Sequence, residues 1–261
     1  RMLAQGLSSG SLDMGWMRKH YGTRSADYES PLLTDAGWRY GATQQLTLEA
    51  HAEQQQDMYN GGLGAYWMPI MGLGVINGFA VASQGPDGAG TKYGGGYQWS
   101  GHGVSLAATS TINSARFADN ASLSGSTPLR RSDAVWLSGN VSQLGTFGAG
   151  LVRQRADSQL SRYLNLSWSK SLGRGYFTSL SYTRELGEHA QQLTFTLTVP
   201  FGRQDLINVQ AQGQNRQWNY RHQTENNSDG WRWQVGQSRG SSGTRYADIG
   251  NVNPWGEWHI G

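Results

Sequence analysis

Apolar and polar residues alternate along most of the chain with a period of two, and this pattern constrains the fold more than any other feature. Residues 46–53 read Leu-Thr-Leu-Glu-Ala-His-Ala-Glu, and residues 193–199 read Leu-Thr-Phe-Thr-Leu-Thr-Val. Successive side chains of a β-strand point to opposite faces, so each run predicts a strand with one apolar and one polar face. We count roughly sixteen such runs of about 8–11 residues, and none has a helical period. The chain is therefore predicted to be all-β.

The composition fits a sheet that crosses a membrane better than a soluble globule. Only 37% of the residues are hydrophobic and the mean hydropathy is −0.58, although the chain contains 11 tryptophans. A spanning barrel needs apolar residues only at alternate strand positions, so this low average is compatible with crossing a bilayer. No apolar run approaches the roughly 18 residues of a helical span. We predict an antiparallel up-and-down transmembrane β-barrel.

The alternation assigns residues to the two faces of the predicted barrel wall. Polar strand positions are expected to line a water-filled lumen, and apolar positions are expected to contact lipid. The residues that we expect to face the lumen are Arg39, Glu49, His51, Glu53, Lys92, Arg153, Asn165, Arg221 and Arg232. The residues that we expect to face lipid are Leu46, Leu48, Leu164, Leu166, Leu193, Phe195 and Leu197.

Connections of two lengths are predicted between the strands. Glycine-containing stretches that indicate tight reversals lie at residues 41–44, 100–103, 143–145 and 172–175. Longer polar stretches, which indicate surface loops, lie at residues 23–32, 84–90, 113–133 and 224–229. Short turns on one rim and long loops on the other are typical of an up-and-down barrel.

Motifs that carry catalytic chemistry are weak in this chain. Residues 6–10 read Gly-Leu-Ser-Ser-Gly and match the nucleophile-elbow pattern, but that motif needs a following helix and a strand is expected here. His51 shares a strand face with Glu49 and Glu53, an arrangement able to bind a metal or relay protons, although a solvated lumen wall explains it more simply. We predict no catalytic, cofactor-binding or metal-binding residue, and hence no enzyme.

Charge and motif content also argue against nucleic-acid and nucleotide partners. The 21 basic and 18 acidic residues give a net charge of +3, and the basic residues are scattered rather than clustered. No glycine-rich phosphate-binding loop ending in Lys-Ser or Lys-Thr occurs. Because the chain has no cysteine, neither a disulfide framework nor a thiolate metal site can form.

Several blocks, in this order and spacing, resemble the fimbrial chaperone-usher outer-membrane ushers. The first blocks are residues 5–22, residues 25–28 with Ser-Ala-Asp-Tyr, residues 38–43 with Trp-Arg-Tyr-Gly-Ala-Thr, and residues 46–53. Further blocks are residues 179–184 with Ser-Leu-Ser-Tyr-Thr-Arg and residues 193–202, which close on Val-Pro-Phe-Gly. The resemblance extends over essentially the whole chain.

The resemblance implies a wide outer-membrane barrel with an internal plug and with periplasmic domains at both ends. Residues 1–261 would be a single segment of the barrel wall after the plug, and the plug, N-terminal and C-terminal domains would not be present. The chain starts at Arg1 without a secretory signal, so we expect a piece of a longer precursor. About sixteen strands would then make a partial barrel.

The function implied by the resemblance is translocation of pilus subunits across the bacterial outer membrane, with the pore as their assembly platform. Partners would be periplasmic chaperone–subunit complexes and outer-membrane lipid, and no ATP would be needed because donor-strand exchange between subunits orders assembly. One alternative is a general porin or polysaccharide export channel. Another is a soluble β-sandwich adhesin or lectin, which would bury its apolar faces.

Overall fold

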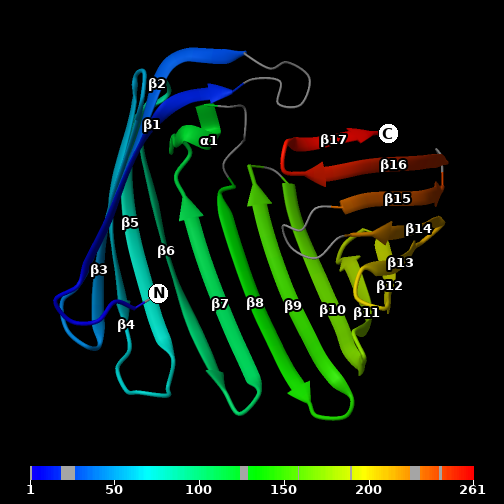
Figure 1. The fold of residues 1–261 in the computed structure, drawn as a ribbon. Helices are drawn as coiled ribbons and strands as arrows, with labels where there is room; N and C mark the ends of the chain where they lie inside the picture. The colour runs from blue at the N-terminus through cyan, green and yellow to red at the C-terminus, as the bar shows by residue number, and fades with distance from the viewer. Residues whose placement is uncertain are drawn as a thin grey trace. The chain divides into compact units, whose positions relative to one another are not determined.

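The computed structural model describes residues 2–18, 27–123, 129–157, 159–188, 190–223, 230–240 and 243–261. Within these residues the chain forms seventeen β-strands and one helix of four residues (Figure 1). The strands belong to one sheet, and the consecutive strands of residues 8–113 and of residues 159–260 pair antiparallel. The prediction of an all-β, antiparallel up-and-down fold is confirmed, with seventeen strands where the alternation indicated about sixteen.

The elements follow one another along the chain as a simple meander. The strands of the first part and the helix are β1 (Ser8–Arg18), β2 (Tyr28–Gly41), β3 (Leu46–Gln55), β4 (Met58–Trp67), β5 (Val75–Gly85), β6 (Gly88–Gly101), β7 (Val104–Asn113) and α1 (Asn120–Leu123). The remaining strands are β8 (Arg131–Val141), β9 (Gly145–Ala156), β10 (Gln159–Gly173), β11 (Tyr176–Glu185), β12 (Gln191–Phe201), β13 (Asp205–Gln212), β14 (Asn215–His222), β15 (Gly230–Arg239), β16 (Thr244–Asn253) and β17 (Gly256–Ile260).

The chain divides into two compact units. Unit 1 comprises Arg1–Leu137 and Leu151–Arg162, and unit 2 comprises Ser138–Gly150 and Tyr163–Gly261. In unit 1 each strand from β1 to β7 pairs with its neighbour in the sequence, and β3 to β7 lie side by side in Figure 1. In unit 2 the strands from β10 to β17 pair in the same consecutive way.

The predicted tight reversals are confirmed, whereas two of the predicted long loops are wrong at least in part. Strands end and begin within a few residues at all four positions, 41–44, 100–103, 143–145 and 172–175. The stretch 84–90 is instead a short turn, because β5 extends to Gly85 and β6 begins at Gly88, whose φ of 105° suits glycine. The stretch 23–32 contains the start of β2, and its residues 23–26 lie outside the described part.

The other two predicted loops are the stretches 113–133 and 224–229. The stretch 113–133 is a long connection between β7 and β8, as predicted, and it contains α1 within its described residues. The stretch 224–229 lies outside the described residues.

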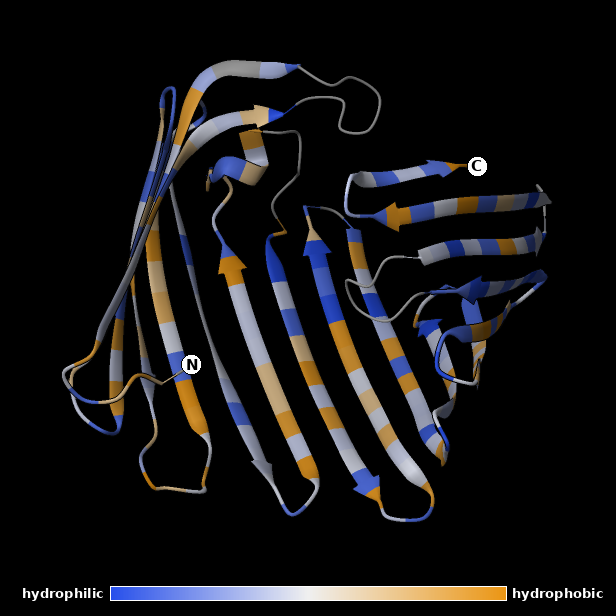
Figure 2. Ribbon diagram, in the orientation of Figure 1, coloured by the Kyte–Doolittle hydropathy of each residue, from blue (hydrophilic) through white to orange (hydrophobic). Residues whose placement is uncertain are grey.

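Large apolar side chains are exposed on the sheet rather than gathered in a core. Orange and paler bands alternate along strands such as β5 and β7 in Figure 2, as a period of two requires. Leu63 is 71% exposed and Leu12 is 64% exposed, while Met58, Phe117 and Ala118 are the buried apolar residues of the described part. No second sheet covers these side chains within the described residues of unit 1, in contrast to the β-sandwich alternative. Among the described residues, no helix is long and apolar enough to span a membrane.

Candidate functional site

One face of strands β2 to β7 collects the polar residues of unit 1, and we call it the polar face of unit 1. Arg39 of β2 lies directly opposite Glu49 of β3, and Asp35 lies directly opposite Glu53. Glu53 then lies opposite Asn60 on β4. Because directly opposed residues point to the same side of a sheet, the register places five predicted lumen residues on this face together: Arg39, Glu49, His51, Glu53 and Lys92.

A polar face of the same kind runs through unit 2. Asn165 lies opposite Thr183, whose hydroxyl donates a hydrogen bond of 2.9 Å to the Asn165 side-chain oxygen. Following the register from strand to strand, Arg221 and Arg232 share the face of Asn165. Arg232 forms an ion pair of 2.5 Å with Glu257.

The predicted apolar residues fall on the opposite face in each unit. In unit 1, Leu48 lies opposite Tyr40 and Ala65, on the side away from Glu49, and Leu46 shares that side. In unit 2 the register from β10 through β12 places five predicted apolar residues on one face: Leu164, Leu166, Leu193, Phe195 and Leu197. The two predicted sets therefore separate onto opposite faces within each unit, and the face of Arg153 stays a prediction.

Arg153 lies in β9, outside the strands β2 to β7 that carry the polar face of unit 1. In β8, the carboxylate of Asp133 accepts a hydrogen bond of 2.7 Å from Ser110 of β7. Ser110 lies opposite Gly95. It points to the other side of β7 from Asn113, which lies opposite Lys92. The contact between Ser110 and Asp133 therefore lies on the apolar side of β7, and the face of Arg153 stays a prediction.

A segment that follows β7, residues 114–123, folds back against the polar face of unit 1, and we call it the crossing segment. Ser114 exchanges two hydrogen bonds of 2.8 Å with the backbone of Thr91. The amide of Ala118 donates to the Ser83 hydroxyl at 3.0 Å, and the amide of Asn120 donates to Glu53 Oε2 at 3.0 Å. The sheet therefore holds the segment through three separate strands.

A local hydrogen-bond motif shapes the crossing segment where it turns into α1. Asp119 precedes the helix, and its carboxylate accepts a hydrogen bond of 2.9 Å from the amide of Ser122. The Ser122 hydroxyl lies 2.9 Å from the amide of Asp119 in return, so the two residues form a reciprocal cap. Asp119 also lies 3.9 Å from the ammonium of Lys92, which stands 5.1 Å from the centre of the Phe117 ring.

Glycines on the polar face provide the space in which the crossing segment and Phe79 lie. A Cβ on Gly90 would come within 2.3 Å of the Phe117 backbone, so only glycine allows this approach. A Cβ on Gly94 would lie 2.6 Å from the Ser110 carbonyl oxygen and 2.9 Å from the Phe79 ring. The absence of a side chain at Gly90 and Gly94 therefore has a packing reason in unit 1.

A pocket of about 510 Å³ lies between the crossing segment and the strands. Its lining combines polar residues with glycines, threonines and the Phe79 and Phe117 rings; the charged members are Glu49, Glu53, Lys92 and Asp119, and His51 lies among them. Charges of both signs line it, so the pocket is polar without a strong preference for either sign of ligand.

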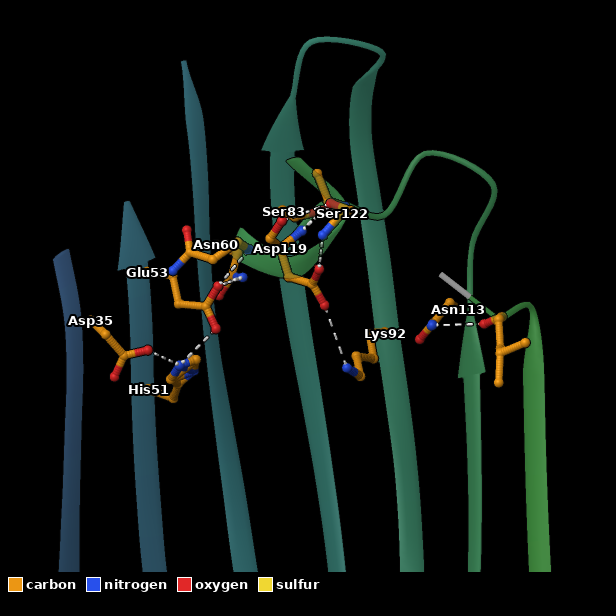
Figure 3. A network of polar contacts seen from close by, with 12 residues as sticks. Asp35, His51, Glu53, Asn60, Ser83, Lys92, Asn113, Asp119 and Ser122 are labelled. Carbon is orange, nitrogen blue, oxygen red and sulfur yellow. Dashed lines mark hydrogen bonds and ion pairs between the residues drawn. The ribbon is translucent and has the colours of Figure 1, made fainter. Parts of the chain in front are cut away.

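The charged residues of β2 and β3 form two separate groups. The Arg39 guanidinium binds Glu49 with N–O distances of 3.0 and 2.9 Å, which removes Glu49 from the set that was considered around His51. His51 Nε2 lies instead 3.3 Å from Asp35 Oδ2 and 3.2 Å from Glu53 Oε1 (Figure 3). These three residues could hold a metal ion, since their ligand atoms lie within 4.8 Å of one another.

The serine of the nucleophile-elbow pattern at residues 6–10 lies in a β-strand. Ser8, the serine of the nucleophile-elbow match, is the first residue of β1 and lies opposite Tyr40 of β2. A nucleophile elbow needs a sharp turn from a strand into a helix, and here a strand follows the serine. The match therefore lacks the local structure that would expose a nucleophile.

Three residues of the site were not predicted from the sequence: Asp35, Asn60 and Asp119. A signal existed for Asp35, because it has the same parity as Arg39 on a strand that a tight turn joins to residues 46–53. No signal in the sequence indicated that Asp119 would return to Lys92, since the long loop could have taken many paths.

No protein-family model matches the chain, and no curated protein matches its sequence. Solved structures do match it. One is the structure of the P pilus usher (PapC) translocation pore, with a TM-score of 0.57 and 16% identity over 97% of this chain and 56% of that chain. A second crystal structure of the usher PapC translocation pore gives 0.52 and 16%, over 97% and 54% of the two chains.

A larger assembly gives a similar match. The E. coli P pilus tip assembly intermediate PapC-PapD-PapK-PapG, in its second conformation, matches with a TM-score of 0.66 and 16% identity, over 97% of this chain and 34% of the matched chain. The chain thus spans between about a third and just over half of the length of the chains that it matches. Its fold is similar to that of part of these usher translocation pores.

Proposed function

We propose that residues 1–261 form a single segment of the pore wall of an outer-membrane usher. The pore moves pilus subunits, delivered by periplasmic chaperones, across the bacterial outer membrane and serves as their assembly platform without ATP. The plug and the periplasmic domains belong to other parts of the protein in this proposal. The likeness of the fold to usher translocation pores supports it.

The observation that carries the proposal is the separation of two faces along the sheet. The apolar face exposes large side chains in unit 1, among them Leu63 at 71% and Trp67 at 49%. Exposed apolar surface of this extent needs a partner, and the hydrocarbon layer of a membrane is the partner that a single sheet of spanning strands can have. The polar face, with its Glu, His, Arg, Asn and Thr side chains, then lines a hydrated lumen.

A hydrated lumen suits the passage of folded protein subunits. Threonine, asparagine and glutamine side chains offer many weak hydrogen bonds to water and to a passing surface, and the mixed charges give no strong ion selectivity. The chaperone–subunit partners are supported by the likeness to the PapC-PapD-PapK-PapG intermediate. The energy for ordering would reside in the subunits, where one strand completes the sheet of the next subunit.

Deletion of the gene in its native bacterium tests the proposal. We expect pilus subunits to accumulate in the periplasm and to disappear from the cell surface, and a wild-type copy to restore them. Cell fractionation with immunoblotting of the subunits gives the measurement, together with uptake of small solutes. Unchanged surface pili with reduced solute uptake would favour the porin alternative and refute the usher proposal.

A further inference from the structure

The three residues Asp35, His51 and Glu53 form a set of potential metal ligands on the polar face of unit 1. They come from β2 and β3, and they are two-thirds to five-sixths buried, with side-chain exposures of 37%, 33% and 16%. Imidazole nitrogen and carboxylate oxygen are common ligands of Zn²⁺ and similar divalent ions. Bond lengths of about 2.0–2.2 Å in a tetrahedron separate neighbouring ligand atoms by roughly 3.3–3.6 Å. The observed separations from His51 Nε2, 3.3 and 3.2 Å, lie close to that range.

A single linear hydrogen bond from His51 does not account for both of its carboxylate contacts. His51 Nε2 carries at most one proton, yet it faces carboxylate oxygens of Asp35 and Glu53 at nearly equal distances. A charge-assisted hydrogen bond is usually about 2.7–2.9 Å long, so neither contact has the length of a strong ion pair. Two nearly equal contacts around one nitrogen, with all three ligand atoms within 4.8 Å of one another, leave room for a cation between them.

The surrounding residues orient the Glu53 carboxylate so that one oxygen is left for a metal. Glu53 Oε2 accepts hydrogen bonds from Asn60 Nδ2 and from the amide of Asn120, both at 3.0 Å, whereas Oε1 points to His51. Partners of this kind outside the ligand set fix ligand orientation in metal sites. Figure 3 shows Glu53 between His51 on one side and Asn60 on the other.

Asn60, which holds Glu53, is itself buried at the edge of the site. Asn60 lines the same pocket as His51 and Glu53 and is only 6% exposed, and its Oδ1 atom has no hydrogen-bond partner among the described residues. A buried amide oxygen without a partner is costly, because it loses its hydrogen bonds to water. Burial fixes the Asn60 amide, whose Nδ2 holds Glu53 Oε2 and leaves Oε1 for the site.

We propose that Asp35, His51 and Glu53 bind a divalent transition-metal ion of the Zn²⁺ type, with a remaining position open to water in the pocket. Binding takes neutral imidazole and two carboxylates, so any proton on His51 is released to solvent. Since Glu53 also holds the amide of Asn120, the ion would stabilise the crossing segment where it contacts β3.

Titration of the full chain, purified in detergent without a histidine tag, tests the site. We would measure Zn²⁺ binding by calorimetry in buffers of different ionisation enthalpy, and the visible absorption of added Co²⁺. The variants are His51→Gln and Asp35→Asn, with Glu49→Gln as the matched control on the same strand and face. Electrophoretic mobility with and without heating reports whether each variant is folded.

The proposal expects one Zn²⁺ per chain with proton release in the wild type and in Glu49→Gln, and loss of this binding in His51→Gln and Asp35→Asn. Asn60→Ala should weaken it by about 10–100-fold, the usual effect of losing a residue that supports a ligand. If His51→Gln fails to fold, Asp35→Asn decides. Absence of binding in the wild type, or equal binding in wild type and folded ligand variants, overturns the proposal and leaves an ion-pair cluster. Subunit secretion is not measured, so this result is independent of the proposed pore function.

Discussion

Replacement of Leu63 with arginine tests whether the apolar face of unit 1 contacts lipid. Leu63 lies in the middle of β4, opposite Ala50 and Ala80, and is 71% exposed. If this face met water, the change would alter the free energy of unfolding by no more than about 0.5 kcal/mol, as is usual at exposed sites. An arginine facing lipid near the bilayer midplane of a β-barrel costs roughly 2–4 kcal/mol. We expect the larger value.

The matched control is Thr109→Arg, which adds the same side chain to the polar face. Thr109 lies in β7 opposite Gly96 and lines the pocket, so its arginine would reach water. Denaturant unfolding of the full chain in lipid vesicles, followed by tryptophan fluorescence, gives both free energies. Equal costs for the two variants, or a cost below about 0.5 kcal/mol for Leu63→Arg, would refute the assignment of the faces.

Three further substitutions test two single contacts and one assignment of a residue to a face. Gly94→Ala should lower the free energy of unfolding by roughly 1–3 kcal/mol in a denaturant titration, because its Cβ would lie 2.6 Å from a carbonyl oxygen of the next strand. Ser83→Ala removes the acceptor of the Ala118 amide and should cost about 1–3 kcal/mol, with faster hydrogen exchange at that amide. Leu48→Arg should reduce the folded fraction of the protein in outer-membrane extracts, whereas Glu49→Gln should not.

Each of these substitutions has a control or a contradicting result. Gly78→Ala is the control for the glycine, because its Cβ would meet no atom nearer than 3.9 Å and should leave stability nearly unchanged. Ser83→Thr keeps the hydroxyl, so slow exchange should persist there; unchanged exchange in Ser83→Ala would show that the contact does not hold the crossing segment. Equal membrane assembly of the Leu48 and Glu49 variants would contradict their placement on different faces.

The extent of sequence-based prediction differs between strands and connections. Residues 46–53 alternate without interruption, and they lie within β3, because a period of two is a property of the strand itself. The prediction of a long loop at residues 84–90, based on glycine, proline and aspartate, is wrong. Pro86 and Asp87 alone complete the turn, a pair that suits the central positions of a type I turn.

The sequence by itself determined the strands and the two faces, because both follow from the alternation of side chains along an extended backbone. Only the tertiary structure decided which charged residues meet. Asp35 reaches His51 across a strand register, and Asp119 reaches Lys92 through a loop. Such contacts depend on which strands pair and on the path of a long connection. Neither can be predicted from the residues that make the contact.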